Sequence, residues 1–62
     1  MPRYQIVTLS TGQKQLCLMA GLAQGKAHLM KQGYTPCQNP RILRMGNHYA
    51  TYNEIHKHWS MT

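Results

Sequence analysis

A turn signal in the C-terminal third of the chain constrains the fold most. Two runs rich in strand-forming residues, 41–45 and 48–52, are separated by Gly46 and Asn47. A Gly-Asn pair between such runs is typical of a hairpin with a two-residue primed turn. If Met45 pairs with His48, one face of the hairpin suits a core and carries Arg41, Leu43, Met45, His48, Ala50 and Tyr52. The other face carries Ile42, Arg44, Tyr49 and Thr51, so that Arg44 lies beside Tyr49 as an exposed basic and aromatic pair.

The segment 22–32 has the pattern of an amphipathic helix. Its apolar residues recur at helical spacing: Leu22, Ala23, Ala27, Leu29 and Met30. Gly33 follows where a left-handed C-terminal cap belongs, with Tyr34 able to fold back onto the last turn. Gly25 inside the segment costs about 1 kcal/mol relative to alanine, so it either permits close packing or the helix begins after it.

The N-terminal part contains one clear strand and one ambiguous segment. Residues 3–9 are rich in β-branched and aromatic types and end at a Ser-Thr-Gly turn signal, which predicts a strand. In 13–20, Ser10 with Gln13 fits a capping box and predicts a helix. Equally, Gly12 can turn the chain so that Leu16 and Leu18 share one face of a second strand. We favour the hairpin, because the first strand otherwise has no neighbour in sequence with which to pair.

Two further segments complete the prediction. Two prolines in 35–40 predict a loop, because each disfavours helix in the residue before it. After it and the hairpin, Asn53 can cap a short closing helix with Glu54 in its first turn. Ile55 and Trp59 would then lie one turn apart, and the helix would dock through Trp59.

These elements predict one small α+β domain over residues 1–62. A small antiparallel sheet, made of the N-terminal strand or hairpin and the C-terminal hairpin, packs on the main helix. If 10–20 is helical instead, the element order is that of a winged helix-turn-helix, with 41–52 as the wing. A chain of about 60 residues buries only roughly 60% of its unfolded surface, so we expect a thin core and a homodimer.

The charge balance indicates a class of partner. Seven lysines and arginines stand against one acid, Glu54, which gives a net charge of +6 and a pI near 9.8. A surface so poor in carboxylates attracts polyanions. The predicted nucleic-acid contacts are Arg41, Arg44, Tyr49, Lys26, Lys31, Lys57 and His48.

Other chemistry has weak support in the sequence. Two cysteines and four histidines could ligate zinc, but they lack the close pairs that structural zinc sites use. One acid in the chain excludes mechanisms that need two carboxylates. A Cys-His nucleophile pair has no informative spacing, and no phosphate-binding glycine loop occurs. We therefore expect no enzyme activity, no metal and no cofactor.

The leading functional hypothesis is a non-catalytic, regulatory nucleic-acid-binding module for DNA or RNA. The alternative is a small inhibitor or adaptor that docks on an acidic surface of another protein. The sequence has neither a secretory signal nor an apolar run long enough to span a bilayer, so we expect a cytoplasmic protein without membrane association. In that compartment Cys17 and Cys37 would be reduced.

Overall fold

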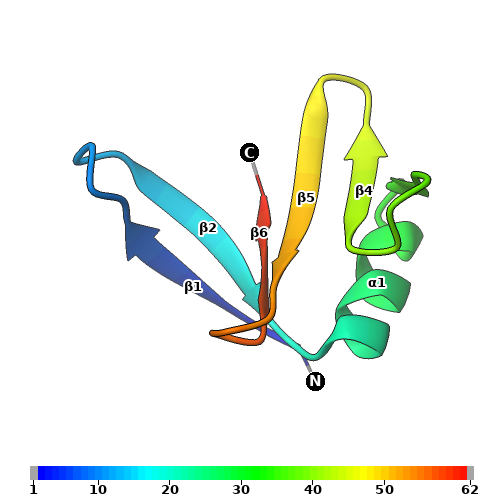
Figure 1. The fold of residues 1–62 in the computed structure, drawn as a ribbon, viewed down its shortest axis with the longest axis horizontal. Coiled ribbons are helices and arrows are strands. Elements are labelled where there is room, and N and C mark those ends of the chain that lie inside the picture. Colours follow the sequence, from blue (N-terminus) through cyan, green and yellow to red (C-terminus); the bar gives the residue numbers. More distant parts are fainter. Residues whose placement is uncertain (1, 62) are drawn as a thin grey trace.

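The structure, a computed structural model, describes residues 2–61 and consists of one antiparallel sheet with one helix. The elements in chain order are β1 (Arg3–Thr8), β2 (Lys14–Met19), α1 (Leu22–Lys31), β3 (Thr35–Pro36), β4 (Ile42–Met45), β5 (His48–Asn53) and β6 (His58–Met61). The strands lie in the order β1-β2-β6-β5-β4-β3, so the last strand joins the two hairpins (Figure 1). The predicted α+β class is confirmed.

The N-terminal hairpin that we favoured is confirmed. β1 pairs with β2 so that Ile6 faces Leu16 and Tyr4 faces Leu18. The chain reverses at Gly12, whose φ is 86°, and the amide of Leu9 donates to the carbonyl of Gln13 at 2.7 Å. Residues 14–19 are therefore a strand, and not the helix that the capping box predicted.

The C-terminal hairpin has the predicted register, with Met45 opposite His48. Gly46 has a φ of 60° and Asn47 does not have a positive φ, which is the pattern of a type II′ turn. Leu43 and Ala50 on the predicted core face are fully buried. Local turn chemistry therefore sets the register of this hairpin.

The predicted closing helix is wrong. Asn53 does accept hydrogen bonds from the amides of Ile55 at 2.9 Å and His56 at 3.2 Å, but the chain reverses at Lys57, whose φ is 55°. Residues 58–61 return as β6 between β2 and β5, and Trp59 lies opposite both Leu18 and Tyr52. Pairing on both sides satisfies more backbone groups than one isolated helical turn can.

The predicted loop at 35–40 also needs a correction at its start. Thr35 and Pro36 form the short strand β3, which pairs with Arg44 and Leu43 of β4. A proline is compatible with an outermost strand, because its missing donor can face away from the ladder.

α1 ends as predicted, in a glycine cap. The amide of Tyr34 donates to the carbonyl of Leu29 at 3.1 Å, and the amide of Gly33 donates to the carbonyl of Met30 at 3.2 Å. This pair of bonds is the Schellman motif, and it needs Gly33 because its φ is 113°. The cap directs Tyr34 into the core, where it is buried.

The core forms where α1 crosses the sheet. A Cβ atom at position 25 would overlap Cδ1 and Nε1 of the Trp59 indole, so Gly25 permits the close packing that we considered. Only Gly25 and Leu29 of α1 are buried, together with a half-buried Leu22. Ala23, Ala27 and Met30, predicted on the apolar side, are exposed, because the helix contacts the sheet along a narrow line.

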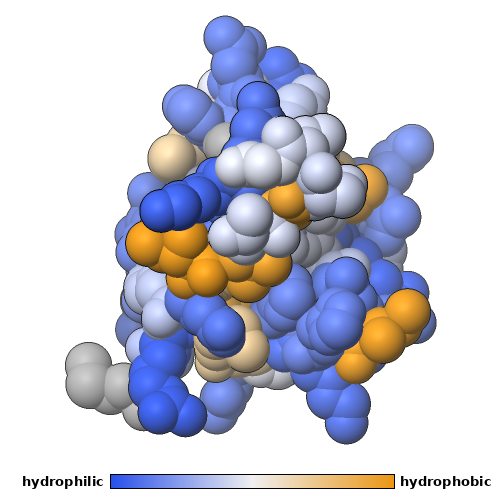
Figure 2. All heavy atoms as spheres, turned by 90° about the vertical axis from the view of Figure 1, so that its left-hand side faces the viewer, coloured by the Kyte–Doolittle hydropathy of each residue, from blue (hydrophilic) through white to orange (hydrophobic). Residues whose placement is uncertain are grey.

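The helix leaves much of the sheet uncovered. Figure 1 shows the tip of the β1–β2 hairpin extending away from α1, which contacts the sheet at β6. Figure 2 looks at the side that carries this hairpin, and apolar atoms gather there in a patch surrounded by hydrophilic atoms. No helix within residues 2–61 is long and apolar enough to cross a bilayer.

Candidate nucleic-acid interface

The sheet face opposite α1 is a surface that could receive an extended ligand. We call it the open face. Strand alternation gives it the following residues: Arg3, Gln5, Val7, Gln15, Cys17, Met19, Thr35, Ile42, Arg44, Tyr49, Thr51, Asn53, His58 and Ser60. Because the sequence holds one acid, and Glu54 lies in the turn after β5, none of these side chains is a carboxylate.

Arg44 and Tyr49 form the predicted pair on the open face. They are direct cross-strand partners, and the Arg44 guanidinium carbon lies over the Tyr49 ring at 5.8 Å from its centroid. Nε of Arg44 donates to the carbonyl of Gly46 at 2.8 Å, which fixes the side chain along the hairpin. Tyr49 is 43% exposed, so part of its ring is open to solvent. The pair presents a positive charge and an aromatic surface together.

A row of polar side chains crosses the middle of the open face. Gln5, Cys17, Ser60 and Thr51 follow one another on neighbouring strands. Cys17 is buried in this row, and its Sγ lies 3.6 Å from Oγ of Ser60. The others offer hydrogen-bonding groups to a ligand.

The site residues predicted from the sequence omitted Arg3 and this polar row. Arg3 lies on the open face at the opposite side of the sheet from Arg44. Four strand spacings separate β1 from β4, which is about 19 Å. The alternation in 3–9 could have placed Arg3 and Gln5 on one face, but only the strand order shows that Arg44 shares that face.

Two histidines lie at the end of the open face near the β5–β6 turn. The rings of His56 and His58 stack with centroids 5.6 Å apart. His58 is buried, and this burial, with a smaller contribution from the nearby His56, lowers the pKa of His58 below its ordinary value of 6.5. His58 is therefore neutral at physiological pH and adds no charge to the open face.

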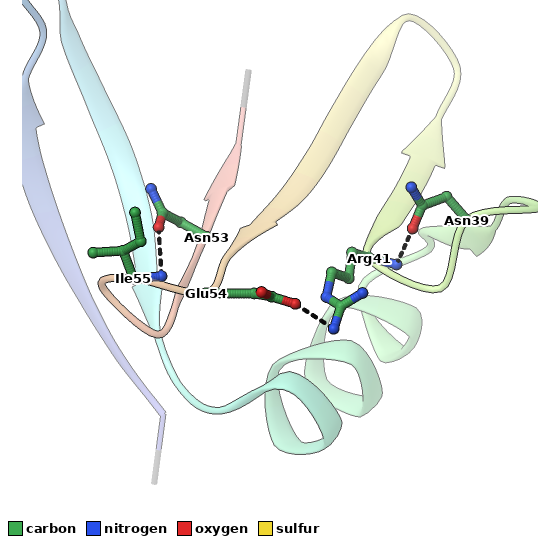
Figure 3. Close-up of polar contacts among 5 residues, drawn as sticks. All are labelled: Asn39, Arg41, Asn53, Glu54 and Ile55. Atoms are coloured by element: carbon green, nitrogen blue, oxygen red, sulfur yellow. Dashed lines mark hydrogen bonds and ion pairs between the residues drawn. The ribbon is translucent and has the colours of Figure 1, made fainter.

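Arg41 does not lie with Arg44. Its guanidinium forms an ion pair with the carboxylate of Glu54, and its amide donates to Oδ1 of Asn39 at 2.9 Å (Figure 3). The only acid in the sequence is thus partnered by one of the predicted contact residues. This solvent-exposed ion pair places the carboxylate beside Arg41, so Arg41 is less available to a phosphate than Arg44 is.

The remaining predicted residues are distributed over other parts of the molecule. On α1, Lys26 is half-buried and Lys31 is exposed. The two lysines are five residues apart in the helix, so their side chains point about 140° away from each other around its axis. Lys57 is in the β5–β6 turn, and His48 is exposed at the register position opposite Met45. The structure therefore brings together Arg44 and Tyr49 on the open face, places His48 next to Tyr49 but on the other face of the hairpin, and places the other four residues on other elements and turns.

Among residues 2–61, no three histidine, cysteine or acidic side chains are arranged to hold a metal ion. Comparison with protein-family models, with curated proteins and with solved structures finds no match to this chain.

Proposed function

We propose that the protein is a non-catalytic module that binds nucleic acid on its open face. The observation that carries the proposal is the uncovered, carboxylate-free open face with Arg44 held against Tyr49. In this proposal Arg44 contacts a phosphate, and a base stacks on the exposed part of the Tyr49 ring. Polar side chains such as Gln5 and Thr51 supply hydrogen bonds along the strand of nucleic acid.

The proposal favours single strands over duplexes. A ring that stacks on a base at a sheet surface needs an unpaired base. A helix that could enter the groove of a duplex is absent from the open face, because α1, the only helix in residues 2–61, lies on the other face of the sheet. We further propose a regulatory role in the cytoplasm, where the two free thiols, Cys17 and Cys37, stay reduced.

The test is a fluorescence-anisotropy titration of labelled single-stranded DNA, duplex DNA and single-stranded RNA at two salt concentrations. We expect Arg44→Ala to weaken binding and to reduce the slope of log K against log salt by about one unit. Tyr49→Leu should weaken single-strand binding by about 1–3 kcal/mol and leave the slope unchanged.

Lys31→Ala is the matched control, because it removes the same charge from α1. Its slope should equal that of the unmodified protein. If Lys31→Ala and Arg44→Ala reduce the slope equally, binding depends on overall charge and not on the open face. No binding at low salt would overturn the proposal altogether.

A further inference from the structure

A second surface lies on the other side of the sheet, on the β1–β2 hairpin. We call Tyr4, Ile6 and Leu16 the hairpin patch. Ile6 is 64% exposed, Leu16 47% and Tyr4 40%. Tyr4 pairs with Leu18 and Ile6 pairs with Leu16, so the patch lies on the sheet face that carries the core, in the region that α1 leaves uncovered. Figure 2 shows apolar atoms gathered on this side of the molecule. Three large apolar side chains with this exposure mark an interaction site.

A pocket deepens the hairpin patch toward the helix. It has a volume of about 400 Å³ and is lined by Tyr4, Leu16, Gln32, Tyr34 and Met61. The Tyr4 hydroxyl lies 2.7 Å from Nε2 of His28 and accepts a hydrogen bond from Nε2 of Gln32 at 3.0 Å. These bonds to α1 hold Tyr4 in place, so one wall of the pocket is preformed.

β1 offers an open backbone edge beside the hairpin patch. Within residues 2–61 it pairs with β2 on one side only, so alternate residues of this six-residue strand direct their backbone N–H and C=O groups to the unpaired side. The opposite edge of the sheet, β3, has two residues, one of which is Pro36. Proline and short length protect an edge against pairing, so β1 is the edge that can accept another strand.

The charges around the hairpin patch select the partner. Lys14 pairs with Thr8 and lies on the same face as Leu16, one step toward the hairpin tip. Lys31 lies near the other end of the patch, where His28 of the same helix contacts Tyr4. Glu54, the only acid, is engaged by Arg41, so no side-chain carboxylate competes for these cations. The surroundings of the patch are complementary to a negatively charged segment.

We propose that the β1 edge and the hairpin patch form a docking site for an acidic, amphipathic segment of a partner protein. The segment adds to the sheet as a strand next to β1. Its apolar side chains pack on Ile6 and enter the pocket between Tyr4 and Leu16. Its carboxylates alternate with these apolar side chains, so they lie on the open-face side of the added strand, beside Arg3.

A second copy of this chain fits the same surface less well. Each copy carries a net charge of +6, so two copies repel each other as they approach. Like charges close together oppose association. An acidic partner turns the same charges into an attraction, and the site shares only Arg3 with the open face.

The test uses a labelled short peptide in which valine and glutamate alternate. Its binding to the protein is measured by anisotropy and compared with the binding of two control peptides. One control has lysine in place of glutamate; the other has the same valines and glutamates, but with the valines grouped together. We expect the alternating acidic peptide to bind at least about tenfold more tightly than either. Its addition should slow hydrogen exchange at the β1 amides that face away from β2.

Matched substitutions locate the site. Ile6→Asn should weaken peptide binding at least about fivefold, whereas Ile55→Asn, the same change at a turn residue that is 86% exposed, should not. Leu16→Gln is a second patch variant, and circular dichroism checks that each variant folds. The Arg44→Ala variant should lose at most the small peptide affinity expected from one unit of charge. Failure of peptide binding is therefore distinguishable from failure of nucleic-acid binding.

Several outcomes would overturn the proposal. Equal binding of the grouped acidic peptide would show general charge attraction without strand addition. A dimer in sedimentation experiments that Ile6→Asn dissociates would assign the patch to a second copy. Binding to anionic phospholipid vesicles with the same dependence on Ile6, and no binding to the peptide, would assign it to a lipid surface.

Discussion

At the scale of single residues, burial changes the chemistry of His58. The side chain is buried on the open face with His56 stacked on it, and both conditions disfavour the imidazolium form. The lowered pKa means that the unfolded chain binds a proton more readily than the folded chain as the pH falls. Stability that is fully present above pH 6.5 is therefore lost between pH 6.5 and the lower pKa of the folded state.

We expect the melting temperature of the protein to fall when the pH is lowered from neutral through this window. His58→Gln should show a smaller fall, because it removes the group that resists protonation. His48→Gln, a substitution at an exposed histidine, should retain the full fall. Thermal unfolding followed by circular dichroism measures all three proteins. An equal fall in all three would assign the pH dependence to other groups.

At the scale of elements, the contact between α1 and β6 depends on one missing side chain. The indole of Trp59 occupies the space of a Cβ atom at position 25, and Trp59 is fully buried. Its Nε1 has no hydrogen-bond partner among the residues that the structure describes, which indicates that close packing dominates this contact.

We expect Gly25→Ala to destabilise the protein by about 1–3 kcal/mol through overpacking, even though alanine favours a helix by about 1 kcal/mol. Chemical denaturation measures the free energy of unfolding. Ala23→Gly is the control. Position 23 is exposed, so only helix propensity acts there, and this variant should be less stable than the unmodified protein. A more stable Gly25→Ala variant would show that Trp59 can move away at little cost.

The elements also show what a sequence can predict for this chain. The 46–47 turn and the Gly33 cap depend on residues that are neighbours in sequence, so the hairpin register and the helix end were predictable. The register in turn predicts the pair of Arg44 and Tyr49. The strand β6 was not predictable, because its conformation depends on pairing with both β2 and β5, and β2 is distant in sequence. The ion pair of Arg41 with Glu54 depends on the same non-local arrangement.

At the scale of the whole molecule, the net charge opposes the compact state. Seven lysines and arginines and one acid give a net charge of +6, which is confined to a body of 29 × 26 × 19 Å. The Debye length is about 30 Å at 0.01 M salt and about 8 Å at 0.15 M, so at low salt the cations repel one another across the whole molecule.

We expect the melting temperature to rise when sodium chloride is raised from about 0.01 M to about 0.15 M, because salt screens this repulsion. Lys31→Glu lowers the net charge from +6 to +4 and should reduce the gain. Differential scanning fluorimetry in the two buffers compares the proteins. A melting temperature that is independent of salt would show that the cations are already too far apart to interact.

The place of β6 at the centre of the sheet has a consequence for biosynthesis. A ribosome makes β6 after all the other described strands, yet it is the strand that joins the β1–β2 hairpin to β5. Before β6 emerges, the nascent chain has two unconnected hairpins and a helix whose glycine faces no tryptophan. Folding of the complete sheet must therefore follow translation of this segment. Until then Leu18 and Tyr52 lack Trp59, the residue that lies opposite both in the finished sheet, and the unfinished chain exposes apolar surface.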